Sequence, residues 1–107
     1  MQQTPASMRR YPRIDLPKGM MVAWQSGAQR QAGRIGTLSL GGIFIRTPNP
    51  SLAGTLLQLV FEVPDGDVHA RGNVVYVQPG KGMGIQFRGM VAAESARLAH
   101  LLKRLLQ

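Results

Sequence analysis

The chain has 107 residues, a length suited to one domain with a single core, and its hydrophobic content of 44% is that of a folded protein. It contains no cysteine, which excludes disulfide frameworks, zinc–thiolate sites and cysteine nucleophiles. Thirteen Lys and Arg against five Asp and Glu give a net charge of +8, which favours an anionic partner, either nucleic acid or a phosphorylated small molecule. The polar N-terminus and the absence of a long apolar run predict a soluble, cytoplasmic protein with no membrane span.

The first part of the chain is expected to lack regular structure. Residues 1–8 form a loose tail in this interpretation, and residues 9–17 form an arm. Prolines at positions 12 and 17 exclude a helix there and favour an extended conformation. The arm carries Arg9, Arg10 and Arg13, and in an extended segment Arg9 and Arg13 point the same way along one face.

Six short apolar segments separated by turn residues follow the arm. The expected strands are residues 20–24, 33–38, 42–46, 55–63, 68–78 and 83–88, and the polar stretch 25–31 is expected to be a hairpin loop. The alternation is clearest in residues 55–63, where Leu57, Leu59, Phe61 and Val63 face one way. The face of the following strand is expected to carry Val68, Ala70, Val74 and Tyr76, and Gly72 within that strand indicates a bulge or a close backbone approach.

The pattern changes to a helical period at Ala92. Leucines at positions 98, 101, 102, 105 and 106 form one stripe, with Glu94 near the start and cations near the end, as the helix dipole favours. The strands and this helix together predict a mainly β fold, a six-stranded antiparallel β-barrel with a C-terminal amphipathic α-helix. The helix either covers its own barrel or pairs with a partner, and the first arrangement is preferred because it is commoner.

Residues suited to catalysis are scarce. His69 falls within a strand and His100 on the polar side of the helix, while Asp65 and Asp67 have the setting of an exposed turn. Ser39 has no evident base, and no spacing typical of metal ligands occurs. The sequence therefore predicts no enzymatic activity, no catalytic residues, no metal site and no cofactor.

The turn at residues 37–42 is the other distinctive feature. Its adjacent glycines, Gly41 and Gly42, allow backbone angles that other residues avoid and let a ligand or another chain come close. The Ser39 hydroxyl and free backbone N–H groups would form a small anion cradle, and the alternative is a hairpin turn that needs glycine only to reverse direction. The arginine arm favours the cradle, because guanidinium groups bind phosphates and guanine edges.

Together the two stretches resemble a known signature. Arg9-x-x-x-Arg13 followed by Thr37-x-Ser39-x-x-Gly42 resembles the R-x-x-x-R and [D/N]-x-S-x-x-G motifs of PilZ domains. The similarity continues through the strands and the closing helix over residues 8–106, which implies a PilZ-like domain at 9–107 that includes the arm.

Many PilZ domains are bacterial receptors for cyclic di-GMP (c-di-GMP). The resemblance implies that Arg9, Arg10 and Arg13 hold guanine edges and phosphates, while Ser39 and the Gly41–Gly42 turn contact this ligand from the barrel surface. One position departs from the signature, because Thr37 stands where the family has an acid or amide. A carboxylate can accept both N1–H and N2–H of a guanine, whereas Thr37 accepts with one oxygen only, a loss on the order of 1–3 kcal/mol in binding.

The sequence thus predicts a c-di-GMP sensor that signals to a downstream protein partner when its arm becomes ordered. Two alternatives remain open. The first is an adaptor of the same fold that binds no nucleotide, which Thr37 supports. The second is a basic barrel that binds nucleic acid non-specifically, which the +8 charge supports and the scarcity of exposed aromatic residues opposes.

Overall fold

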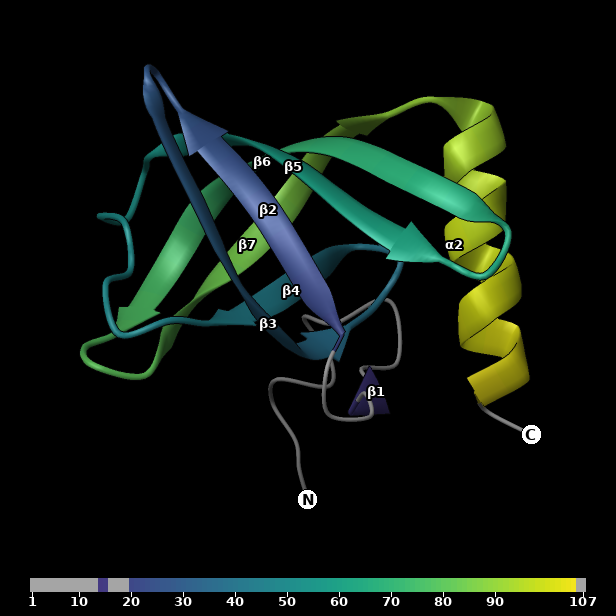
Figure 1. Ribbon diagram of the computed structural model, residues 1–107, viewed down its shortest axis with the longest axis horizontal. Coiled ribbons are helices and arrows are strands. Elements are labelled where there is room, and N and C mark those ends of the chain that lie inside the picture. The colour runs from purple at the N-terminus through teal and green to yellow at the C-terminus, as the bar shows by residue number, and fades with distance from the viewer. Residues whose placement is uncertain (1–13, 16–19, 106–107) are drawn as a thin grey trace.

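The computed structural model describes the backbone of residues 14–15 and the backbone and side chains of residues 20–105 (Figure 1). The predicted tail at residues 1–8, the three arginines of the arm and Leu106 lie outside the described residues.

Strands and one helix account for most of the described chain. The elements are β1 (Ile14–Asp15), β2 (Met21–Ser26), β3 (Gln29–Leu38), β4 (Gly42–Arg46), β5 (Leu56–Val63), β6 (Gly66–Gln78), β7 (Gly82–Met90) and α2 (Ala92–Leu105). All pairings are antiparallel in the order β1-β3-β2-β5-β6-β7-β4, and an additional pairing of β3 with β4 closes the strands β2 to β7 into a barrel. The predicted six-stranded barrel with a C-terminal helix is therefore confirmed, and the short β1 adds to the edge of β3.

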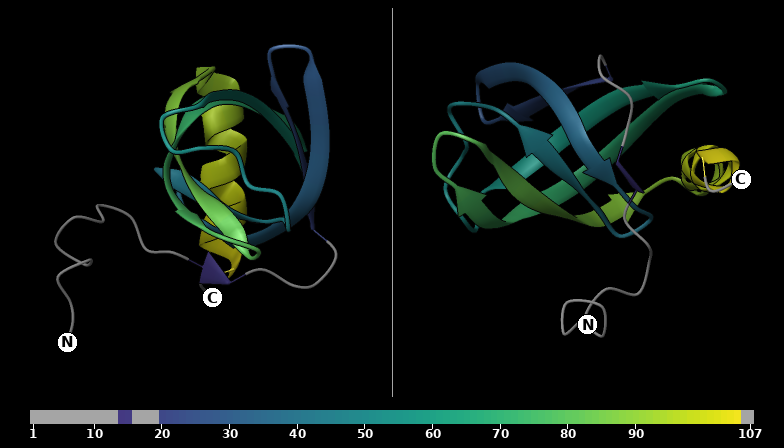
Figure 2. Two further views of the ribbon diagram at one scale, coloured as in Figure 1. Left: turned by 90° about the vertical axis from the view of Figure 1, so that its left-hand side faces the viewer. Right: turned by 90° about the horizontal axis from the view of Figure 1, so that it is seen from below.

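The barrel interior is filled by the strand residues that the alternation assigned to one face. Leu57, Leu59, Phe61 and Val63 are each between 2% and 4% exposed, as predicted. The helix α2 packs against β5 and β6, and its leucines at 98, 101 and 102 belong to the same core cluster. Figure 2 shows this helix beside the barrel, at the end where the β5–β6 hairpin turns. The predicted packing of the leucine stripe on its own barrel is confirmed for these three leucines.

The hairpin between β2 and β3 is tighter than predicted. The expected loop at residues 25–31 is wrong, because Gln25 pairs with Arg30 and Ser26 with Gln29, leaving a turn of two residues. Gly27 occupies that turn at φ +59°, the left-handed region that glycine adopts without strain. At this end both strands stand away from the core and carry polar residues. The sequence therefore has no apolar alternation there that would indicate a strand.

Two irregularities in β6 shift its pairing with β7. The first, at Arg71–Gly72, confirms the predicted bulge and close approach, since a Cβ on Gly72 would lie 2.6 Å from Cγ2 of Ile85. The second, between Val74 and Tyr76, rotates the strand. Tyr76 is 36% exposed as a result, and its expected place on the buried face is wrong.

Two histidine–carboxylate contacts attach the helix to the hairpin beside it. Oε1 of Glu94 accepts from the backbone N–H of His69 at 2.5 Å and lies 3.0 Å from Nδ1 of the same residue. Oδ2 of Asp65 lies 2.5 Å from Nδ1 of His100. The hydrogen bond from the His69 backbone lowers the pKa of Glu94, and the hydrogen bond with His100 lowers the pKa of Asp65. Neither this helix nor any other helix in the described residues is long and apolar enough to span a membrane.

Candidate functional site at the β3–β4 turn

Ser39 holds the turn between β3 and β4 together from the inside. Its Oγ accepts hydrogen bonds from the backbone N–H groups of Gly41 and Gly42, both at 3.1 Å, and lies 3.3 Å from the Gly42 carbonyl, to which it donates. The backbone N–H of Ser39 also donates to that carbonyl, at 2.9 Å. The side chain is only 5% exposed.

The expectation of free backbone N–H groups is therefore wrong for Gly41 and Gly42. A short hydroxyl side chain in a tight turn bonds the backbone two and three residues ahead, which is the geometry that Ser39 adopts. The sequence predicted that Ser39 and the backbone N–H groups bind an anion together. In the described turn, Ser39 instead bonds those N–H groups itself and fixes the backbone.

Gly42 is required by space. Its φ is not among the positive values of the described chain, so the expected unusual backbone angle is not its reason for being glycine. A Cβ at this position would lie 2.3 Å from the carbonyl oxygen of Ile85 on β7, a separation that real Cβ atoms do not show. The carbonyl of Gly41 accepts from the N–H of Phe87 at 2.9 Å, so the turn is attached to β7 as well. The sequence predicted that a ligand or another chain comes close to Gly42, and in the structure the strand β7 does so.

Thr37 begins a row of residues on the outer surface of the barrel. It pairs with Phe44, Phe44 pairs with Gly84, and Gly84 pairs with Tyr76, so their side chains share the face opposite the core. The rings of Phe44 and Tyr76 stack across the glycine, with centroids 6.1 Å apart. Gly84 has to be glycine here, because a Cβ would lie 2.1 Å from the Tyr76 ring. An aromatic surface thus adjoins the turn.

Two arginines flank this row and were not predicted as site residues. Arg34 and Arg46 face each other across β3 and β4, and the ion pairs within residues 20–105 involve neither of them. Like charges directly opposite each other are unfavourable unless an anion or solvent screens them. The bulge between Ile35 and Thr37 brings this pair next to Thr37 on one face. Gly36 was the one indication of this bulge in the sequence, and it can be interpreted as a bulge only once the register of β3 and β4 is known.

The Oγ1 atom of Thr37 is buried and has no hydrogen-bond partner among the described residues. The residue itself is half-buried at the end of β3, where its backbone pairs with Asp15 of β1. An unpartnered hydroxyl oxygen is unfavourable, and it lies at the position that departs from the family signature. The structure thus brings Thr37, Ser39, Gly41 and Gly42 into one turn, while Arg9, Arg10 and Arg13 lie outside the described residues.

The model of one protein family matches nearly the whole chain. That family is the PilZ domain, matched over residues 7–104. The chain belongs to the PilZ domain family. The predicted resemblance is confirmed, and no curated protein sequence matches the chain.

Solved structures with the same fold include other PilZ proteins. The inhibitor of motility MotI/DgrA of Bacillus subtilis has a TM-score of 0.75 at 20% identity, covering 99% of this chain and 53% of that protein. YcgR from Escherichia coli in complex with c-di-GMP has a TM-score of 0.76 at 19% identity, covering 92% and 46%. The complex of K. pneumonia MrkH with c-di-GMP has a TM-score of 0.74 at 20% identity, covering 92% and 51%. This PilZ domain therefore spans about half the length of each of these proteins.

Proposed function

We propose that this PilZ domain is a receptor for c-di-GMP, which its arginine arm and its β3–β4 turn bind together. The observation that carries the proposal is the position of β1. Ile14 pairs with Leu38 and Asp15 with Thr37 in antiparallel register, so the chain read backwards from Ile14 leads towards the turn. Arg13 is bonded to Ile14, and one residue adds at most about 3.8 Å of reach. The pairing of Ile14 with Leu38 beside the turn supports a site that the arm and the turn share.

The chemistry of the surface at the turn supports the same ligand. Arg34 and Arg46 add positive charge without a carboxylate partner among the described residues, which favours a phosphate diester nearby. The stacked rings of Phe44 and Tyr76 offer an apolar plane next to this charge. Nucleotide bases stack on aromatic and guanidinium planes, so a purine dinucleotide suits this combination better than inorganic phosphate does.

The proposal gives each site residue a role. Arg9, Arg10 and Arg13 bind the phosphates and the guanine edges, and Thr37 supplies a single oxygen on the barrel side. Ser39 acts indirectly, because its hydroxyl is committed to the N–H groups of Gly41 and Gly42. The ligand neutralises an arm that repels itself when empty, and the ordered arm then signals to a protein partner.

An adaptor that binds no nucleotide is the second candidate. Thr37 lacks the bidentate acceptor of the family signature, and the Ser39 hydroxyl is already bonded within its own turn. In this alternative the domain acts on its partner through its surface alone.

Calorimetric titration separates the two candidates. The receptor binds c-di-GMP and binds GMP far more weakly, because one arm and one turn engage two phosphates and two bases. Arg9→Ala and Arg13→Ala each weaken binding, whereas Arg104→Ala, which removes the same charge from the exposed side of α2, leaves it nearly unchanged. No heat with c-di-GMP, or equal affinity for GMP, would overturn the receptor and favour the adaptor.

A further inference from the structure

A second polar row crosses the outer face of the barrel from the first residues of β3 to β6, at a distance from the β3–β4 turn. Arg30 of β3 pairs with Gln25 of β2, Gln25 pairs with Gln58 of β5, and Gln58 pairs with Arg71 of β6. The row therefore has an arginine at each end and two amides between them, on the face opposite the core. We call these four residues, Arg30, Gln25, Gln58 and Arg71, the arginine–glutamine row.

The surface along this row is hollowed. Three adjoining hollows of about 410, 490 and 670 Å³ all include Gln58 in their lining. The largest lies over the neighbouring row of small residues, Ala32, Ala23 and Val60, which pair with one another across β3, β2 and β5. The long side chains of one row thus form a wall beside a floor of small side chains.

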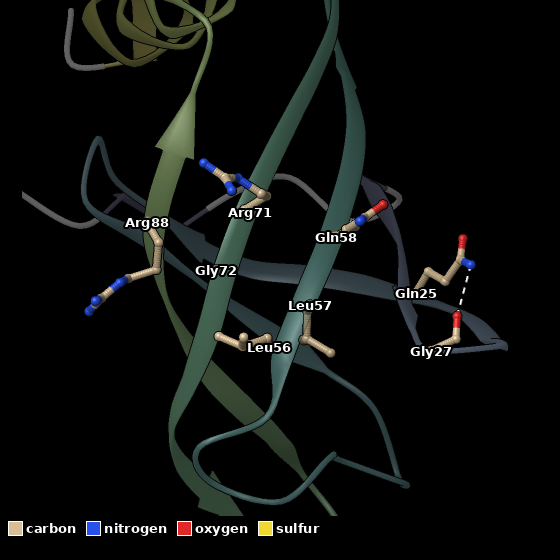
Figure 3. A pocket seen from close by; sticks show the side chains of 8 residues that line it. All are labelled: Gln25, Gly27, Leu56, Leu57, Gln58, Arg71, Gly72 and Arg88. Atoms are coloured by element: carbon tan, nitrogen blue, oxygen red, sulfur yellow. Dashed lines mark hydrogen bonds between the residues drawn. The ribbon is translucent and has the colours of Figure 1, made fainter.

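The hollow next to the β5–β6 pair is the one drawn in Figure 3. Gln58 and Arg71 project from neighbouring strands there, and the amide of Gln25 is fixed by a hydrogen bond to the Gly27 carbonyl at 2.9 Å. Leu56, 73% exposed, adds an apolar side chain at the edge of the hollow.

Arg71 lies against a glycine of the neighbouring strand and has no acidic partner within residues 20–105. Its guanidinium lies against Gly89 on β7, where a Cβ would come within 2.8 Å of Nη2, so the glycine leaves room for it. The ion pairs within residues 20–105 include neither Arg71 nor Arg30. The acidic residues of that part of the chain are gathered on the β5–β6 hairpin and the first turn of α2, and they are Glu62, Asp65, Asp67 and Glu94. The row is therefore basic while the opposite charge is collected elsewhere.

We propose that the arginine–glutamine row and its alanine floor form a docking surface for an acidic segment of a partner protein. Charge complementarity requires carboxylates opposite Arg30 and Arg71, and the amides of Gln25 and Gln58 can bond the backbone of the segment between them. Three strand spacings separate the two arginines, about 14 Å along the surface, which four residues of extended chain span. The floor of alanines accepts small side chains in between.

A protein segment fits this surface better than single-stranded nucleic acid does. Nucleic-acid grooves combine cations with aromatic rings on which bases stack. Among Phe, Tyr and Trp, only Trp24 lines any of these hollows, the largest one, and it is only 2% exposed. This inference rests on the proposed function in one respect, that the domain acts through a protein partner.

The test uses a fluorescein-labelled peptide of Glu-Ser-Gly-Ser repeats, whose carboxylates lie about 13 Å apart when extended, and measures its fluorescence anisotropy at low salt. The same peptide with Gln in place of Glu is the charge control. The double variant Arg30→Gln/Arg71→Gln removes both ends of the row. Lys103→Gln/Arg104→Gln removes the same charge from exposed positions on α2 and is its matched control. Ala32→Leu fills the floor without changing charge, and Ala28→Leu in the exposed β2–β3 turn is the control for it.

The proposal predicts binding of the Glu peptide alone. Arg30→Gln/Arg71→Gln should weaken this binding about tenfold and Lys103→Gln/Arg104→Gln by less than about threefold, because only the first pair contacts the peptide. Ala32→Leu should weaken it while Ala28→Leu does not. Equal weakening by the two double variants would overturn the proposal, since net charge alone would then explain binding. Row-dependent binding of oligothymidine in preference to the Glu peptide would overturn it in favour of nucleic acid.

Titration of the same variants with c-di-GMP separates this inference from the receptor proposal. Arg30→Gln/Arg71→Gln should bind c-di-GMP like the wild type, because Arg71 lies on β6 and Arg30 lies at the end of β3 opposite to the β3–β4 turn. Loss of row-dependent peptide binding with nucleotide binding intact refutes the docking surface alone. Row-dependent peptide binding by a wild type that binds no c-di-GMP refutes the receptor and supports the docking surface.

Discussion

Replacing Ser39 by alanine tests whether this residue stabilises the turn. Ser39→Ala removes the acceptor of the Gly41 and Gly42 N–H groups, both at 3.1 Å, inside a turn where the serine is 5% exposed. A buried N–H group without a partner costs about 1–3 kcal/mol. Both glycines are half-buried, so water reaches them in part and the low end applies to each. The expected loss is about 2 kcal/mol in the free energy of unfolding, or roughly 8 to 16 °C in melting temperature for a domain of this size.

Thermal unfolding followed by circular dichroism measures this loss. Ser26→Ala is the matched control, because the hydroxyl of Ser26 makes no hydrogen bond within the described residues and the residue lies at the end of β2. The control should melt within about 2 °C of the wild type, as surface substitutions do. If Ser39→Ala melts as close to the wild type as the control does, the hydroxyl is not holding the turn. Ser39 and both N–H groups would then be available to a ligand, in agreement with the anion-binding turn that the sequence predicted.

The remaining stability predictions concern the strand closure and the helix. Gly42→Ala should lower the free energy of unfolding by about 1–3 kcal/mol, because its Cβ would lie 2.3 Å from the carbonyl oxygen of Ile85. Denaturant titration measures this loss, and an unchanged midpoint would show that β7 can move away. Leu102→Asp should unfold the domain, because Leu102 is 7% exposed and an unpaired buried carboxylate costs about 3–5 kcal/mol. A normal melting curve would mean that the leucine stripe of α2 does not pack on the barrel. The pKa values of Asp65 and Glu94 are lowered from 3.8 and 4.5 in the folded protein. Their contribution to stability is therefore complete above those values and is lost as pH falls through the lower folded pKa values, so the melting temperature should drop below about pH 4. Glu94→Gln should make that drop smaller, and an acid transition of unchanged size would show that this contact does not attach the helix.

Alternation of apolar residues was a reliable guide where one face of a strand lies in the core. Leu57, Leu59 and Phe61 could be assigned to the interior from the sequence because every second residue is apolar and the strand has no bulge. The same reasoning failed for Tyr76, where a register shift after Val74 reverses the faces. A bulge adds one residue to one strand only, and that displacement depends on the partner strand, which a single strand's pattern does not contain.

The candidate site shows the corresponding limit for motifs. The spacing of Thr37, Ser39 and Gly42 located the turn correctly, but it did not reveal in which direction the serine hydroxyl points. A turn hydroxyl can bond a ligand or its own backbone with the same residues at the same spacing. Arg30 and Arg71 were separated by forty-one positions in the sequence, and only the registers of the strands between them place both in one row.

Thr37 is the position where family membership and the structure together give the sharpest prediction. Thr37→Asp should tighten c-di-GMP binding by about tenfold, because a carboxylate accepts both N1–H and N2–H of a guanine where threonine offers one oxygen. The same change should lower the melting temperature of the ligand-free protein, since Oγ1 of Thr37 is buried and no group among the described residues bonds it to compensate a charge. Arg34 and Arg46 face the same side of the sheet and reduce that penalty in part.

Two further variants determine which property of the side chain matters. Thr37→Val keeps the shape and removes an oxygen that bonds no residue in the part of the chain that the structure describes, so it should leave stability unchanged or raise it slightly. If Thr37→Val also keeps the affinity for c-di-GMP, Thr37 contributes no contact to the ligand, and a gain with Thr37→Asp is then a new interaction. Thr37→Asn accepts one guanine N–H without adding charge and should fall between the wild type and Thr37→Asp. Calorimetry at one fixed salt concentration compares all four proteins, because phosphate contacts are screened by salt. Weaker binding by Thr37→Asp, with a raised melting temperature of the empty protein, would mean that the new carboxylate pairs with nearby arginines and blocks the site, so that position 37 does not face the guanine.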